Sequence, residues 1–240
     1  MRIKLSRVLT CLGIVSVLTP VLPLTLPARA AETHRAHHLQ YEPDIRAFEA
    51  ADKTNPPPKD AVLFIGSSSI RKWTSAPTQF PGHQIINRGF GGSYLSDSVA
   101  FADRIVIPYR PRLVVLYAGD NDIAGGCKPE EVSRAFQTFV AKVREELPQT
   151  TIAFIAIKPS PSREKFLEQN REANRLIHEF IGADPKLLYL DVFTAMRTAD
   201  RHTRSELFES DRLHLNEAGY QLWAEILKPV LDRIDPPTSQ

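Results

Sequence analysis

The stretch "LFIGSSSIRKW", residues 63–73, sets an apolar run directly before three consecutive serines. An apolar run that leads into a predicted helix is typical of a strand in an α/β protein. In such folds, ligands bind just beyond the carboxyl ends of the strands. Ser67, Ser68 and Ser69 are therefore candidate catalytic hydroxyls, although serines that cap a helix are common at the same place.

Two known serine motifs do not match this stretch. Residue 70 is Ile, so the G-x-S-x-G turn of α/β-hydrolases is not formed. Ser69-Ile70-Arg71-Lys72 has the S-x-x-K spacing of penicillin-binding proteins, but neither Ser-Asp-Asn nor Lys-Thr-Gly follows it. The motif around the serines thus leaves the identity of a nucleophile open.

Short apolar runs alternate with longer amphipathic segments along the rest of the chain. We predict strands at 61–66, 84–88, 112–118, 151–157 and 187–192. Apolar residues at three- and four-residue steps predict a helix after Pro129 and another that includes Leu222 to Leu231. Because strands such as "RLVVLYAG" are apolar along their whole length, the fold class is α/β, with a parallel sheet covered on both faces.

The first thirty residues have the three parts of a secretory signal peptide. A basic start precedes an apolar stretch from Val8 to Leu18, and Ala28-Arg29-Ala30 forms an A-x-A cleavage site. The alternative, a retained membrane anchor, is disfavoured because prolines at 20, 23 and 27 interrupt the stretch before it reaches the ~20 residues of a spanning helix. We expect cleavage after Ala30 and a periplasmic or secreted protein without stable membrane insertion.

Cleavage changes what the composition implies. The full chain has a formal net charge of +2, and the segment 1–30 holds four basic residues and no acidic one, so the mature chain would carry −2. A nucleic-acid partner is therefore not expected. Cys127 is the one cysteine that remains, so no intramolecular disulfide is expected either. We interpret Cys127 as incidental to function.

Residues 31–60 are polar and contain a triple proline, and we interpret them as an N-terminal arm before a domain at 61–240. A short helix is expected near residues 44–52. His34, His37 and His38 lie in this arm, and we assign them to a solvated tail rather than to a metal site. His178 falls off the apolar face of its helix and is expected to be exposed.

The segment "SDRLHLNEAGY", residues 210–220, places Asp211 and His214 three residues apart before the last helix. A histidine can act as a general base while a carboxylate orients its ring. Chance pairs at this spacing are frequent, so the pair alone is a weak signal. It gains weight because the fold can bring this loop to the same sheet edge as Ser68.

Two loops after predicted strands can contribute further groups. In "AGDNDI", residues 118–123, Asn121 can donate hydrogen bonds to a developing oxyanion. The acids of this loop match part of the twelve-residue calcium-binding pattern. We reject a calcium site, because Ala124 occupies the fifth position of that pattern and a strand rather than a helix precedes the loop. In "NRGFGGSYLSDS", residues 87–98, the glycines permit close approach of the backbone to a ligand or form merely a flexible turn.

Taken in sequence order, "FIGSSS", "RGFGGS", "GDND" and "DRLH" resemble the four blocks of the SGNH hydrolase superfamily, also called GDSL esterases and lipases. The resemblance extends from about Ala61 to Ile234. It implies a flavodoxin-like three-layer α/β/α sandwich with a five-stranded parallel sheet. It also implies hydrolysis of acyl esters without a metal or cofactor.

The resemblance assigns roles residue by residue. Ser68 takes the place of the nucleophile, His214 that of the base, and Asp211 that of the carboxylate that orients it. The oxyanion hole then comprises the Ser68 and Gly92 amides and the Asn121 side chain. Ser67 stands where the family usually has Asp, and Ser69 where it usually has Leu, which is a departure from the GDSL form.

The expected substrate is a small acyl ester, such as a short-chain lipid ester or an acetylated sugar. Two other functions stay open: transfer of the acyl group to another alcohol, and a non-catalytic carbohydrate- or lipid-binding module of the same fold. Trp73, Phe90 and Tyr94 lie near the expected site and would either line a pocket or pack in the core.

Overall fold

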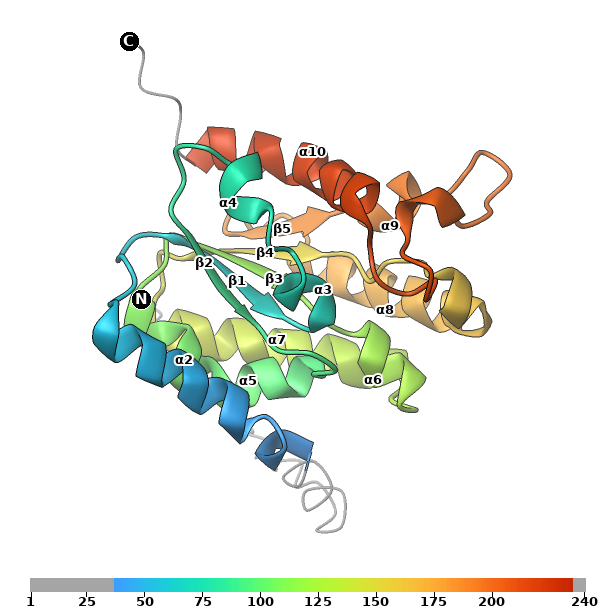
Figure 1. Cartoon of the computed structure of the whole chain (residues 1–240). Helices are drawn as coiled ribbons and strands as arrows, with labels where there is room; N and C mark the ends of the chain where they lie inside the picture. The colour runs from blue at the N-terminus through green and yellow to red at the C-terminus, as the bar shows by residue number, and fades with distance from the viewer. Residues whose placement is uncertain (1–36, 235–240) are drawn as a thin grey trace, which may run out of the picture.

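The computed structural model describes residues 37–234, which form a three-layer α/β/α sandwich (Figure 1). Five parallel strands make one sheet in the order β2-β1-β3-β4-β5. The predicted fold class is thereby confirmed. The predicted signal peptide and His34 lie outside the described residues.

The strands coincide with the predicted segments to within a few residues. They are β1 (Val62–Gly66), β2 (Ile85–Gly89), β3 (Leu113–Tyr117), β4 (Thr151–Ile155) and β5 (Leu187–Leu190). β1 lies between β2 and β3, because Val62 is in register with Ile85 on one side and with Leu113 on the other. Every residue of β1, β3 and β4 is buried.

The side chains of a central strand enter two separate cores. Leu63 and Ile65 of β1 belong to one hydrophobic cluster, whereas Val62 and Phe64 belong to the other. Successive side chains of a strand point to opposite faces, so a strand between two helix layers must be apolar at every position. This is why the run before the serines shows no polar alternation.

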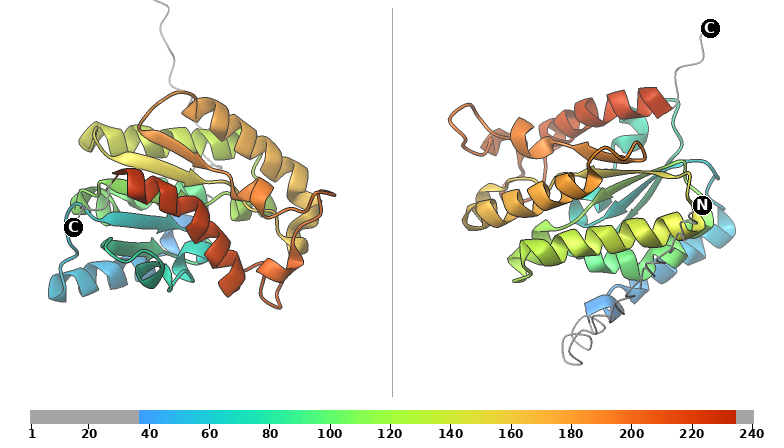
Figure 2. Two further views of the ribbon diagram at one scale, coloured as in Figure 1. Left: turned by 90° about the horizontal axis from the view of Figure 1, so that it is seen from above. Right: turned by 180° about the vertical axis from the view of Figure 1, so that it is seen from behind.

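Helices cover both faces of the sheet (Figures 1 and 2). One layer holds α2 (Glu42–Thr54), α5 (Leu95–Ile105), α6 (Asp120–Ala124), α7 (Pro129–Glu146) and α8 (Leu167–Ile181). The other holds α3 (Ser68–Arg71), α4 (Ala76–Gln79), α9 (Val192–Ala195) and α10 (Glu217–Ile234). Three 3-10 turns complete the described elements: η1 (Ile107–Tyr109), η2 (Pro161–Phe166) and η3 (Ser205–Leu207). Within the described part of the chain, no helix is long and apolar enough to cross a membrane.

The segment interpreted as an arm contributes to the folded layer. The helix expected near residues 44–52 is α2, which packs against α5. Tyr41 and Ile45 are buried, and Arg104 of α5 pairs with Glu42 and Glu49 of α2. Residues 41–54 of the predicted arm therefore belong to this helix layer, on its outer side.

Candidate active site

The turn after β1 makes the three serines unequal. Gly66 has a φ of +138°, and a Cβ built on it would lie 1.8 Å from the carbonyl oxygen of Tyr117 on β3. Only glycine fits there, and the chain turns directly into α3. Ser67 and Ser69 are 1% exposed, whereas Ser68 is partly exposed at the first residue of α3. Ser68 is thus the one hydroxyl of the three that a substrate can reach.

Helix capping does not account for the serines. Ser67 occupies the N-cap position of α3, and its carbonyl accepts the first amide hydrogen bonds of the helix, from Ile70 and Arg71. Its hydroxyl, however, makes no capping bond and has no hydrogen-bond partner within the described residues. The polar side chains of this turn are therefore not used to begin the helix.

The loop between η3 and α10 brings His214 to Ser68, which is 146 residues away along the chain. The Nε2 atom of His214 lies 2.9 Å from the Ser68 Oγ, and its Nδ1 atom lies 2.5 Å from an oxygen of Asp211. The other oxygen of Asp211 accepts the amides of Leu213 and His214, each at 2.9 Å. The hydrogen bond from His214 holds the pKa of Asp211 well below its usual value, so this side chain is a carboxylate.

The other two expected oxyanion donors, Gly92 and Asn121, lie in neighbouring segments that a hydrogen bond joins. Gly92 follows β2 with a φ of +83°, and Asn121 lies in the first turn of α6 after β3. The Asn121 Nδ2 donates to the Ser93 carbonyl at 3.1 Å, next to Gly92. One amide hydrogen of Asn121 is used in this way, and the second is left for another acceptor.

A charged group beside Asn121 was missed by sequence reasoning. Arg163 of η2 donates to the Asn121 Oδ1 at 2.9 Å and pairs with Asp120 at 3.1 Å. Lys158, 1% exposed, also lies 3.1 Å from Asp120 and donates to the Tyr117 hydroxyl. The sequence signal for Lys158 was its position directly after the apolar run that contains β4, because a buried lysine requires a partner.

The two acids of the "GDND" segment have different partners. Burial opposes ionisation of Asp120, but the charges of Lys158 and Arg163 hold its pKa below the usual value. Asp122 instead accepts the Leu95 amide of α5 at 2.9 Å, and burial raises its pKa to about 7. These partners account for both carboxylates without the calcium-loop pattern.

The aromatic side chains near the site are mainly core residues. Trp73 and Phe90 are fully buried, so packing explains them, whereas Tyr94 is partly exposed.

The structure also places Cys127 and His178. Burial raises the pKa of Cys127 to about 11, which keeps this half-buried thiol protonated. His178 is exposed, as predicted, and stacks on Tyr189.

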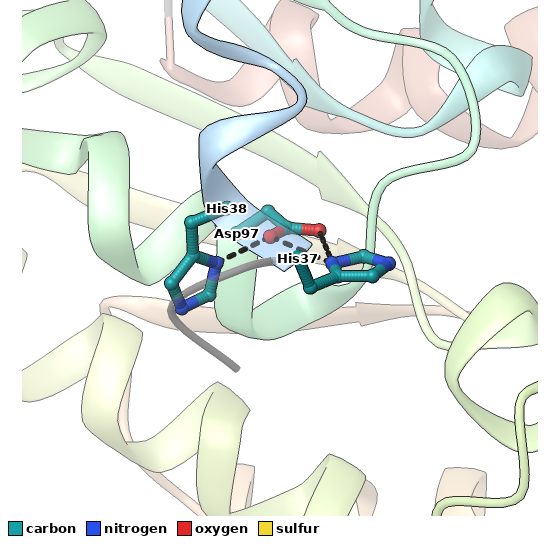
Figure 3. Close-up of side chains that lie close together, drawn as sticks. All are labelled: His37, His38 and Asp97. Atoms are coloured by element: carbon teal, nitrogen blue, oxygen red, sulfur yellow. Dashed lines mark hydrogen bonds and ion pairs between the residues drawn. The ribbon is translucent and has the colours of Figure 1, made fainter. Parts of the chain in front are cut away.

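The prediction that His37 and His38 belong to a solvated tail is wrong. Both rings are held against the folded layer by the buried carboxylate of Asp97 on α5 (Figure 3). Nothing in the local sequence indicates this contact, because the partners are about sixty residues apart and meet only when α2 packs on α5.

The four blocks are thus assembled at one edge of the sheet, and comparison with known proteins agrees with the class of fold. Residues 64–222 match the model of the GDSL-like Lipase/Acylhydrolase family. The chain belongs to this family, which lies within the SGNH hydrolases. Among curated proteins, no match to this chain is found.

Solved structures share the fold at low sequence identity. A protein from Streptococcus pneumonia, provisionally described as a platelet activating factor, is 22% identical with a TM-score of 0.71, over 86% of this chain and 100% of that one. A GDSL-like lipase from Bacteroides thetaiotaomicron is 18% identical with a TM-score of 0.68, over 79% and 97%. An acetyl esterase variant solved with an acetate ion is 16% identical with a TM-score of 0.57, over 75% and 99%.

Proposed function

We propose that this protein is an exported serine esterase that hydrolyses small acyl esters at Ser68. The observation that carries the proposal is the continuous relay from Asp211 through His214 to Ser68, with distances of 2.5 and 2.9 Å. A nucleophile, a base and a carboxylate that orients the base are the groups that acyl transfer requires.

The proposed reaction has two steps. The Nε2 atom of His214 accepts the hydroxyl proton while the Ser68 oxygen attacks the acyl carbon. The same proton passes to the leaving alcohol, which departs and leaves an acyl ester on Ser68. Water, deprotonated by His214, then hydrolyses this ester and restores the serine. Throughout, the ionised Asp211 accepts the Nδ1 hydrogen and stabilises the imidazolium.

An oxyanion forms in both steps, and its proposed donors are the Ser68 amide, the Gly92 amide and the Asn121 side chain. The Ser68 amide lies at the start of α3, where the first amides of a helix have no partner within the helix. Asn121 is held on both sides, by Ser93 and by Arg163. Donors fixed in advance stabilise the developing charge without reorganisation during the reaction.

The proposal of a small acyl group rests on two supports. One of the proteins that share the fold is an acetyl esterase solved with acetate. In addition, Trp73 and Phe90, two aromatic residues that would line a long acyl pocket, are fully buried in the core. Export is supported by the basic start, apolar stretch and A-x-A site of residues 1–30.

Hydrolysis is favoured over acyl transfer by the exposure of the relay. The side chain of Asp211 is 44% exposed and that of His214 is 19% exposed, so bulk water can reach the acyl-enzyme. Acyl transfer would require that an alcohol compete with this water. Adding methanol or a sugar acceptor during turnover and measuring the acylated product tests the alternative.

The central experiment measures hydrolysis of p-nitrophenyl esters with acyl chains of two to twelve carbons. We expect the highest kcat/KM for the shortest chains and, for Ser68→Ala, a loss of nearly all turnover with unchanged folding. Ser67→Ala is the matched control and should retain activity, because this hydroxyl is buried. A fluorophosphonate should label Ser68, as shown by peptide mapping. Labelling of Ser67 or Ser69 would contradict the proposal, and binding of esters without turnover would instead support a non-catalytic module.

A further inference from the structure

The side chains of His37, His38 and Asp97 form a cluster of potential ligands outside the proposed catalytic site (Figure 3). Asp97 belongs to α5, in the helix layer on the opposite face of the sheet from α10. One ring nitrogen of each histidine and a carboxylate oxygen of Asp97 lie within 4.8 Å of one another. The His38 Nδ1 is 2.5 Å from Asp97 and the His37 Nδ1 is 3.1 Å from it. Figure 3 shows the carboxylate between the two rings, with both Nδ1 atoms turned toward it.

This cluster combines one buried ligand with two ligands that are partly open to solvent. The side chain of Asp97 is fully buried, whereas those of His37 and His38 are 23% and 24% exposed. A cation can therefore reach the imidazoles from solvent while the carboxylate stays dry. Across residues 37–234, the ion pairs of Asp97 are with these two rings, and no lysine or arginine neutralises it. A buried carboxylate is costly unless a positive charge is placed beside it.

From these observations, we propose that His37, His38 and Asp97 bind one Zn²⁺ ion. Two imidazole nitrogens and one carboxylate are donors that suit Zn²⁺, which binds nitrogen at about 2.0–2.1 Å. Ca²⁺ and Mg²⁺ prefer sites made of oxygen ligands, so this set discriminates against them. Water completes the coordination on the exposed side of the rings.

The carboxylate is oriented by a group that is not itself a ligand. The Tyr94 amide donates to the second oxygen of Asp97 at 2.7 Å. Tyr94 is the N-cap residue of α5 and Asp97 lies in its first turn, and the centroid of the His37 ring lies 4.0 Å from that of the Tyr94 ring. Hydrogen bonds to a ligating carboxylate of this kind fix its direction and strengthen metal binding.

The position of the cluster gives the ion a structural effect. The cluster joins the chain before α2 to the first turn of α5, which follows the loop that carries Gly92. Tyr41, which contacts the rings of His37 and Phe90, also lies beside that loop: a Cβ built on Gly92 would lie 3.4 Å from its hydroxyl. A bound ion would therefore clamp the N-terminal segment onto the loop that follows β2.

The test measures zinc bound per chain in untagged protein, by elemental analysis after dialysis against trace Zn²⁺, with Co²⁺ as a spectroscopic substitute. We expect one Zn²⁺ per chain, a visible d–d band with Co²⁺, and no binding of Ca²⁺. A Zn²⁺ concentration of about 100-fold over Kd should raise the Tm by roughly 5–10 °C. His37→Ala/His38→Ala should lose the stoichiometric ion, the band and the rise in Tm.

The matched control is His178→Ala/His202→Ala, which removes two exposed histidines far from Asp97 in the sequence and should keep one Zn²⁺ per chain. A second acid and histidine group, Glu209, Asp211 and His214, also offers ligands, so Asp211→Asn should likewise keep the ion.

If the double alanine variant fails to fold by circular dichroism, His38→Gln preserves the side-chain size and should still lose the ion. Less than stoichiometric zinc in the wild type, retention in His37→Ala/His38→Ala, or loss in Asp211→Asn would overturn the proposal. None of these readouts depends on ester hydrolysis.

Discussion

At the scale of single residues, the three serines differ because the turn after β1 leaves just one hydroxyl accessible. Ser67 and Ser69 point into the packed interior, while Ser68 faces His214. Asn121 is constrained in a similar way, because its side-chain amide can donate to an oxyanion only when the nitrogen, and not the oxygen, faces the site. Arg163 donates to its oxygen, which turns the nitrogen away from Arg163 and toward Ser93 and the expected oxyanion.

We therefore predict that Arg163 acts as a positioning residue. Asn121→Ala should lower kcat by roughly 10²–10³ with little change in folding, as is typical for loss of an oxyanion donor. Arg163→Ala should lower kcat by about tenfold or more in the wild type but should have almost no further effect in Asn121→Ala. Arg163→Lys should restore part of the loss. Steady-state kinetics on p-nitrophenyl acetate compare the wild type, the two single alanine variants, the double variant and Arg163→Lys.

The control for this cycle is Arg171→Ala, which removes an exposed arginine whose partner is Glu168. It should leave kcat unchanged. Equal losses for Arg163→Ala in the presence and absence of the Asn121 side chain would show that Arg163 does not act through Asn121.

Asp122 gives a prediction for pH. Burial raises its pKa to about 7 from the usual 3.8, and the carboxylates of Asp120 and Asp97 add to the shift. Between these values the folded state binds more protons than the unfolded state, so stability falls as pH rises. Relative to Asp122→Asn, which cannot ionise, the wild type should lose about 1–3 kcal/mol of unfolding free energy from pH 5 to 7.5.

Urea unfolding of both proteins at the two pH values measures this difference. Leu95 can still donate to the amide oxygen of the Asn variant, so the hydrogen bond between α6 and α5 is retained. A stability difference that stays constant from pH 5 to 7.5 would mean that Asp122 is already ionised at pH 5.

At the scale of elements, the site depends on how three strands end side by side. β1, β2 and β3 are adjacent and parallel, so their carboxyl ends place Ser68, Gly92 and Asn121 at one edge. The loops after β2 and β3 are also bonded directly, through Asn121 to Ser93 and Asp122 to Leu95. The first turns of α5 and α6 therefore hold the two outer oxyanion donors in register with α3.

The turn from β1 to α3 should be the least tolerant of change. Gly66→Ala combines an unfavourable φ with a clash against the Tyr117 backbone, so we expect a loss of at least about 2 kcal/mol of stability together with a loss of activity. The matched control is Gly82→Ala, because Gly82 has a φ of +92° with no atom within 4 Å of the added Cβ.

Gly82→Ala should cost about 1 kcal/mol and leave activity intact, since only the backbone preference is lost. Thermal unfolding and kcat/KM distinguish the two. Equal destabilisation of both variants would show that the contact with Tyr117 relaxes without cost.

At the scale of the whole molecule, the proposed export predicts a shortened mature chain. We expect the cell to remove residues 1–30, so that the mature protein begins at Ala31 and is found in the periplasm or medium. Ala28→Leu should block cleavage, because the site requires small residues. Fractionation, intact mass and N-terminal sequencing check this, and a mature protein that begins at Met1 in the cytoplasmic fraction would contradict it.

The sequence by itself determined the order and type of the elements. Strands buried on both faces must be apolar at every position, so the alternation of such runs with helices predicted the parallel sheet before any coordinates. It also predicted the segments that contain Ser68, Asn121 and His214, because glycines and polar residues at strand ends are local signals. Which of the three serines faces His214 followed from resemblance, and the exposure of Ser68 agrees with it.

Only the tertiary structure decided which distant groups meet. Arg163 lies 42 residues from Asn121, and His37 lies 60 residues from Asp97, with no periodic pattern to join them. Such contacts depend on the packing of η2 against α6 and of α2 against α5, and packing is a property of surfaces that the fold brings together. Local residue patterns encode the elements, whereas the charges that meet at their ends depend on the complete arrangement.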